Sequence, residues 1–96
     1  MSAYVIMIRE RIIDPDEMAI YAEMAPKARG EHPPKPLAFY GAHEALEGAD
    51  ADGIVILEFA DMEAARRWHG SSDYQAAMTH RQLGADYRVL LVEGKT

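Results

Sequence analysis

The chain of 96 residues contains no cysteine. This absence excludes disulfide bonds, thiolate metal sites and redox-active thiols. Basic residues are also scarce, because 10 lysines and arginines are outnumbered by 16 aspartates and glutamates, for a net charge of −6. Nucleic acids and anionic membranes attract proteins that present a basic surface. We therefore expect neither of them as a partner.

Long apolar runs are missing as well, and no stretch reaches the length of a membrane-spanning helix. The first eight residues are apolar, but no basic segment precedes them, and the charged residues Arg9 and Glu10 follow too early for a signal peptide. We therefore expect a cytoplasmic protein. A chain of 96 residues, of which 49% are hydrophobic, is typical of one globular domain, predicted to span residues 1–96.

The sequence also lacks the motifs of common cofactor sites. It has no glycine-rich dinucleotide loop, no P-loop and no Gly-x-Ser-x-Gly nucleophile elbow, so nucleotide cofactors and serine hydrolase chemistry are not supported. The histidines show neither an i,i+4 pair nor the spacing of a metalloprotease, so we expect no metal site and no cofactor. These four histidines are His32, His43, His69 and His80.

Hydrophobic patterning and capping residues predict strands and helical segments that alternate along the chain. Strands are expected at residues 3–12, 36–47, 54–59 and 87–93. Helices are expected from Asp14 to about Ala25, from Asp61 to Gly70, and from Ser71 or Ser72 to Gly84. The resulting βαββαβ order is that of a ferredoxin-like α+β fold with an antiparallel four-stranded sheet.

Three of the predicted strands are apolar on both faces, as residues 5–8, 54–57 and 89–92 show. An antiparallel sheet with one solvated face normally alternates apolar and polar residues. The helices can cover only one face of this sheet, so something else must cover the second. The simplest candidate is a second copy of the chain related by a two-fold axis, which predicts a homodimer through the sheet face.

Several segments then resemble a known family. They are residues 59–75 (FADMEAARRWHGSSDYQ), 80–81 (HR), 85–94 (ADYRVLLVEG), 46–48 (LEG) and the early Asp-Pro at 14–15. This pattern resembles the family catalogued as domain of unknown function 1330. The resemblance implies a dimeric α/β barrel and carries no established activity. Other families with this fold include small monooxygenases and isomerases that act on cyclic or aromatic compounds.

The sequence departs from that family at two places. Many relatives carry a Gly-Gly-Arg element where this chain has residues 40–43 (YGAH), so an anion-binding role for that arginine does not carry over. Where relatives often have Trp-Tyr, this chain has Trp68 followed by His69.

Tyr74, Met78 and Arg81 share one helical stripe, which predicts that Arg81 points into apolar surroundings. One interpretation pairs its guanidinium with a glutamate or with carbonyls at the helix end. The other interpretation makes it the anchor of a ligand carboxylate or enolate, because the guanidinium offers a bidentate fork. We expect Arg81 near a glutamate, with at least one donor free. The candidate glutamates are Glu47, Glu58 and Glu93.

His69 and His80 are the candidates for acid–base catalysis, since an imidazole titrates near neutral pH. A histidine near the end of a helix also has a structural explanation in the helix dipole. Trp68 is expected in the core with its indole N–H satisfied nearby, and a ligand-wall role stays open. The ligand pocket is expected between the sheet and the helices, lined by some of Tyr40, His43, Trp68, Tyr74 and Arg81.

Three functions remain open at this point. The first is a pocket in each subunit that binds a small molecule bearing a carbonyl or carboxylate. The second is a cofactor-free isomerase or monooxygenase-like enzyme. The third is a structural dimer with no ligand. Whether the protein is an enzyme is therefore left open by the sequence.

Overall fold

A four-stranded antiparallel sheet with the strand order β2-β3-β1-β4 forms the base of the molecule. The computed structural model describes residues 1–30 and 33–95. This strand order confirms the predicted ferredoxin-like α+β fold. The elements are β1 (Ala3–Ile12), α1 (Pro15–Met24) with a 3₁₀ turn (Ala25–Lys27), β2 (Lys35–Phe39), β3 (Gly53–Phe59), α2 (Met62–Gly70), α3 (Ser72–Gly84) and β4 (Ala85–Glu93).

The helices begin where side chains satisfy their first N–H groups. The carboxylate of Asp14 accepts a hydrogen bond from the backbone N–H of Asp16 at the start of α1. At the start of α3 the hydroxyl of Ser71 accepts one from the backbone N–H of Tyr74, so the first of the two candidate serines is the cap. No helix within residues 1–30 or 33–95 is long and apolar enough to cross a membrane.

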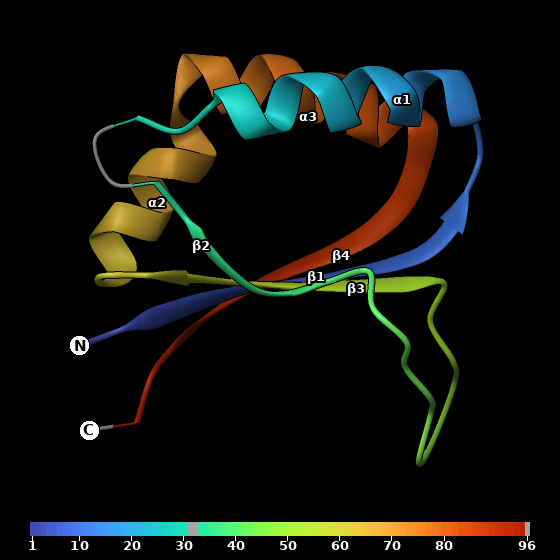
Figure 1. Cartoon of the computed structure of the whole chain (residues 1–96), viewed down its shortest axis with the longest axis horizontal. Helices are drawn as coiled ribbons and strands as arrows, with labels where there is room; N and C mark the ends of the chain where they lie inside the picture. Colours follow the sequence, from blue (N-terminus) through green and yellow to red (C-terminus); the bar gives the residue numbers. More distant parts are fainter. Residues whose placement is uncertain (31–32, 96) are drawn as a thin grey trace.

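All three helices lie on one face of the sheet (Figure 1). Side chains of the central strands alternate between the two faces, and those directed toward the helices are buried. On β1 these are Ala3, Val5 and Met7, which lie opposite Phe59, Leu57 and Val55 of β3.

The other face of the sheet is apolar too, and no helix of the described chain covers it (Figure 1). Leu90 and Val92 of β4 are 49% and 47% exposed there. The prediction of strands that are apolar on both faces is thus confirmed. The remaining apolar members of this open face are Tyr4, Ile6, Ile8, Ile54 and Ile56, which the register places beside them.

The second strand is shorter than predicted, because it ends at Phe39 and not at residue 47. Tyr40 has a positive φ of 54°, a left-handed conformation that turns the chain out of the sheet. Residues 41–50 are exposed and form a loop on the side of the sheet away from the helices (Figure 1). His43 and Leu46 therefore lie in a loop, and Leu46 is 85% exposed.

The end of α3 packs tightly on the start of α1 at Gly84. A Cβ atom at Gly84 would lie 2.8 Å from Cγ of Met18 and 2.9 Å from its backbone nitrogen. We predict that Gly84→Ala lowers the free energy of unfolding by about 1–3 kcal/mol, since the backbone of α1 must move. Gly70→Ala is the matched control, because a Cβ there meets nothing within 4 Å. Urea unfolding measures both variants, and equal midpoints would contradict the proposed contact.

Candidate functional site

Four tyrosines and one arginine lie together between the sheet and the helices, and we call them the tyrosine–arginine cluster. Tyr21 comes from α1, while Tyr74 and Arg81 come from α3, seven residues apart on one helix face. Tyr87 lies on β4, and Tyr40 directly follows β2. Segments distant in sequence therefore build one polar group inside an apolar layer.

The tyrosine hydroxyls of the cluster are arranged in two hydrogen-bonded pairs. The hydroxyl oxygens of Tyr21 and Tyr74 are 2.8 Å apart, and those of Tyr40 and Tyr87 are 2.5 Å apart. Burial, and then the neighbouring hydroxyl of the same pair, raise the pKa of Tyr21 and of Tyr40 well above the ordinary value for a phenol. Both phenols therefore stay protonated at neutral pH and serve as hydrogen-bonding groups.

Arg81 is a buried cation that has no counter-charge within residues 1–30 and 33–95. Only 5% of the residue is exposed, and its Nε–H has no hydrogen-bond partner in that part of the chain. Its Cζ atom lies 5.0 Å from the ring centre of Tyr87 and 6.0 Å from that of Tyr21. These aromatic faces compensate only part of the cost of burying a charge. The arrangement is therefore suited to receiving an anion.

The expected glutamate beside Arg81 was wrong, since no salt bridge joins Arg81 to a carboxylate of residues 1–30 or 33–95. Glu58 pairs with Tyr4 in the register and so points to the open face of the sheet. Glu47 lies in the exposed loop, and Glu93 lies at the far end of β4, opposite Ala3. Strand alternation thus keeps Glu58 away from the cluster, the loop keeps Glu47 away, and the length of β4 separates Glu93 from it.

A solvent-open hollow of about 450 Å³ lies between α3 and β4 and includes Arg81 and Tyr87 in its wall. Met78 and Val89 supply apolar surface beside the guanidinium. Asp86 also lines the hollow, but its carboxylate accepts a hydrogen bond of 2.7 Å from Arg11. The hollow thus places a guanidinium that is unpaired among the described residues beside apolar surface, a combination that suits a small organic anion.

His69 is the histidine that the structure brings to Arg81. It lies at the end of α2, is partly buried and lines the same hollow. Its ring centre is 5.7 Å from that of Tyr74. The imidazole of His69 and the guanidinium of Arg81 therefore border one space, so His69 is the acid–base candidate beside the candidate anion site.

The other catalytic candidate, His80, does not line this hollow. Its Nδ1 lies 2.6 Å from a carboxylate oxygen of Glu17, so it links α3 to α1. This contact gives His80 a structural role between two helices. His32 lies outside the described residues.

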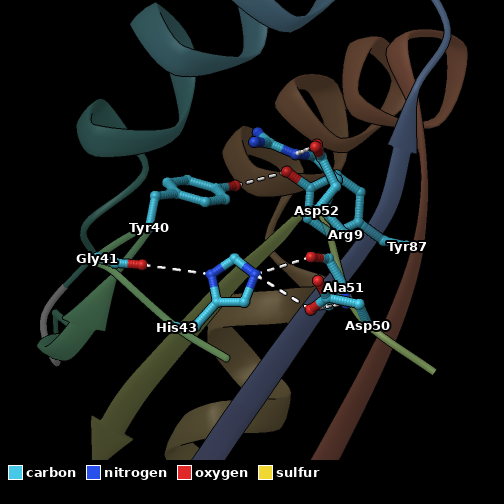
Figure 2. A network of polar contacts seen from close by, with 8 residues as sticks. All are labelled: Arg9, Tyr40, Gly41, His43, Asp50, Ala51, Asp52 and Tyr87. Carbon is cyan, nitrogen blue, oxygen red and sulfur yellow. Dashed lines mark hydrogen bonds and ion pairs between the residues drawn. The ribbon is translucent and has the colours of Figure 1, made fainter. Parts of the chain in front are cut away.

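His43 is also separated from the cluster, since it lies in the loop after β2. Its Nε2 is 2.7 Å from the carbonyl oxygen of Ala51, and its Nδ1 is 3.4 Å from that of Gly41 (Figure 2). These two carbonyls, and then the nearby carboxylate of Asp50, raise the pKa of His43. His43 fastens the base of the loop and lines a different hollow, next to Ile54 on the open sheet face.

Trp68 packs in the core beneath α2, with its ring centre 4.0 Å from that of Tyr74 and 5.3 Å from that of Phe59. The residue is 8% exposed, and Tyr74 is fully buried. The indole N–H of Trp68 is buried, and within residues 1–30 and 33–95 the expected partner is not found. The rings of Phe59, His69 and Tyr74 pack around the indole. Trp68 thus supports the site mainly through packing.

Sequence reasoning missed Tyr21, Tyr87 and Arg9 as members of this region. Strand alternation contained the signal, because Tyr87 shares a face with Val89, and Arg9 shares the helix-facing side with Met7. Arg9 lies over the ring of Tyr40 at 4.6 Å (Figure 2). The pairing of Arg9 with Tyr87 could not be predicted from the sequence, because it depends on the register between β1 and β4.

The comparison with protein families identifies the fold and its family. The model for "Domain of unknown function (DUF1330)" matches residues 2–95. The chain belongs to this family. No curated protein matches the sequence at a significant level.

Solved structures that resemble this DUF1330 chain share its fold at low sequence identity. A protein of unknown function from Rhodopseudomonas palustris is 19% identical with a TM-score of 0.71, over 99% of this chain and 83% of the other. A dimeric ferredoxin-like protein of unknown function from Thermobifida fusca is 18% identical with a TM-score of 0.67, over 98% and 92%. SnoaB, a cofactor-independent oxygenase from Streptomyces nogalater, is 18% identical with a TM-score of 0.58, over 99% and 93%. At these identities the likeness establishes the fold alone.

The packing of Trp68 makes a prediction about stability. Trp68→Ala removes a buried ring between Phe59 and Tyr74, and we expect it to lower the free energy of unfolding by about 3–5 kcal/mol. Phe39→Ala is the control, because Phe39 is 66% exposed and its loss should change stability little. Chemical denaturation monitored by far-UV circular dichroism measures both variants. A wild-type midpoint for Trp68→Ala would assign the indole to a ligand wall instead of the core.

Proposed function

We propose that the protein is a homodimer that binds a small organic carboxylate at Arg81 in each subunit. The observation that carries this proposal is the buried guanidinium, which has no carboxylate partner in the described chain and borders a solvent-open hollow. A bare buried charge is costly, so an arginine kept in this position points to an anion that arrives from outside. A purely structural dimer would give no reason for the missing partner.

The walls of the hollow indicate what kind of anion fits. A guanidinium binds a carboxylate through two parallel N–H···O bonds, which sets the orientation of the ligand. Met78 and Val89 then offer apolar contact to the rest of the molecule. A carboxylate attached to a small hydrocarbon or aromatic group matches both features.

A catalytic function is the second candidate, and the position of His69 is the observation that favours it. His69 lines the hollow of Arg81, where it can accept a proton from a carbon next to the carbonyl of a bound acid. Cofactor-free isomerisation or oxygenation would begin with such a step. SnoaB, with the same fold, is described as a cofactor-independent oxygenase, which supports this class by fold analogy alone.

The open sheet face supports the homodimer. Its exposed leucine and valine side chains on β4 continue the apolar surface of the central strands. A contiguous apolar face of this kind is typical of a protein–protein interface. The ferredoxin-like relative from Thermobifida fusca is described as dimeric. A second copy would cover the face that the helices leave open.

The homodimer predicts a mass of twice the 10.7 kDa chain in sedimentation equilibrium at micromolar concentration. Leu90→Glu places a charge on the open face, and we expect it to shift the equilibrium to monomer because the carboxylate would be buried at the interface. Leu83→Glu is the matched control, since Leu83 is 57% exposed on α3, on the helix side of the sheet. A wild-type protein that sediments as a folded monomer would refute the dimer.

Carboxylate binding predicts the behaviour of Arg81→Met. Removing an unpaired buried charge should leave the free protein as stable as wild type or more stable. Addition of 3-phenylpropionate should raise the melting temperature of wild type but not of Arg81→Met. Arg66→Met, an exposed site on α2, is the control and should keep the ligand-induced shift. Equal shifts in Arg81→Met and wild type would place the binding site elsewhere.

A further inference from the structure

The tyrosine–arginine cluster has more hydrogen-bond donors than acceptors. Its four hydroxyls form two hydrogen bonds, and in each pair one proton is donated while the other proton has no acceptor assigned among the described residues. The Nε–H of Arg81 is a further buried donor that has no acceptor in the described parts of the chain. One carboxylate at Arg81 would not engage the hydroxyl protons as well. The imbalance indicates a ligand with more than one acceptor group.

Tyr87 is the hydroxyl donor best placed to meet such a ligand. Its side chain lines the hollow, and the Cζ atom of Arg81 lies 5.0 Å from the centre of its ring. The hydroxyl stands on the rim of that same ring. A ligand whose carboxylate binds Arg81 therefore has the Tyr87 side chain as a neighbour.

Tyr40 is hydrogen-bonded to Tyr87 through their hydroxyls, and other parts of the chain fix the position of Tyr40. The backbone of Tyr40 has a φ of 54°, a strained conformation for a bulky residue, of the kind that persists where surrounding contacts maintain it. Its ring covers Gly53, where a Cβ atom would lie 2.7 Å from Cδ1 of Tyr40. Arg9 lies over the ring at 4.6 Å and donates a hydrogen bond of 2.6 Å to Asp52 (Figure 2). The contacts of the Tyr40 ring with Gly53 and with Arg9 thus fix its hydroxyl against that of Tyr87.

The direction of the hydrogen bond between the Tyr40 and Tyr87 hydroxyls determines which of the two protons is free. When Tyr40 donates to Tyr87, the oxygen of Tyr87 is an acceptor and its own proton is free for a ligand. Tyr40 would in this way act as a positioning residue, because it settles where the proton of Tyr87 points.

We infer that the ligand is a 2-oxo acid, or the enol form of one, whose carboxylate binds Arg81 and whose 2-oxo oxygen accepts a hydrogen bond from Tyr87. This inference rests on the proposed carboxylate site. It assigns Tyr87 the role of distinguishing a 2-oxo acid from a plain carboxylic acid. A site built to donate to an oxygen rejects the analogue that lacks it, because the donor is left unpaired.

The test compares phenylpyruvate with 3-phenylpropionate, which differ by the 2-oxo group alone. Isothermal titration calorimetry should show that wild type binds phenylpyruvate about tenfold more tightly, the effect of one hydrogen bond. Tyr87→Phe should bind both acids with equal affinity and bind 3-phenylpropionate at least as tightly as wild type does, because it has no donor left unpaired. Tyr40→Phe should lose part of the preference although Tyr87 is present. Tyr4→Phe, on the open face of the sheet, is the control and should keep the full preference.

The outcomes separate this inference from the proposal on which it rests. If wild type binds neither acid, carboxylate binding at Arg81 fails and the inference falls with it. If wild type binds both acids equally, or if Tyr87→Phe keeps the preference, the inference is overturned while the carboxylate site stands. Circular dichroism and melting temperatures establish that each variant is folded. Should Tyr87→Phe not fold, an unchanged preference in Tyr40→Phe overturns the inference by itself.

Discussion

The antiparallel register of β1 with its two neighbours is the constraint on which the rest of the structure depends. Val5 lies opposite both Leu57 and Leu91, and every second residue from there points toward the helices. The same alternation carries Arg9 to the helix side and places Tyr87 opposite it. A slip of one residue would send the core to solvent and the polar groups to the open face. The strand register therefore decides which side chains meet at the site.

The burial of the Arg81 charge carries an energetic cost that the residues packed around it compensate only in part. The helix stripe that carries Tyr74 into the core also carries the guanidinium there, and the aromatic rings beside it supply only partial compensation. An apolar residue at this position would stabilise the isolated chain at least as well. A protein that retains the charge gives up stability at a position where binding would restore it, as functional sites commonly do.

Much of the fold could be predicted because its signals are local. Asp14 and Ser71 act as helix caps through contacts within three residues, and the apolar strands were visible as runs of β-forming residues. The end of β2 could not be predicted, since nothing in the sequence marks Tyr40 for a positive φ. That Arg81 pairs with no carboxylate of the described chain was equally hidden, because the position of Glu58 depends on the register. Tyr87 was overlooked for the same reason, since its partner hydroxyl comes from a residue 47 positions away.

The two faces of the sheet serve different purposes, although they belong to the same strands. On β4, Tyr87 faces the cluster while the neighbouring Arg88 faces the open side, where it donates a hydrogen bond of 2.9 Å to Glu10. Neighbouring residues along each strand point to opposite faces, so assembly through the open face and binding beneath the helices would depend on different side chains of the same strands. The loop after β2 joins the two sides, because Tyr40 at its start belongs to the cluster while His43, three residues later, lines the hollow on the open face. Two covalent links therefore join the face that a partner would cover to the cluster, namely residues 40–43 and the step from Arg88 to Tyr87 on β4.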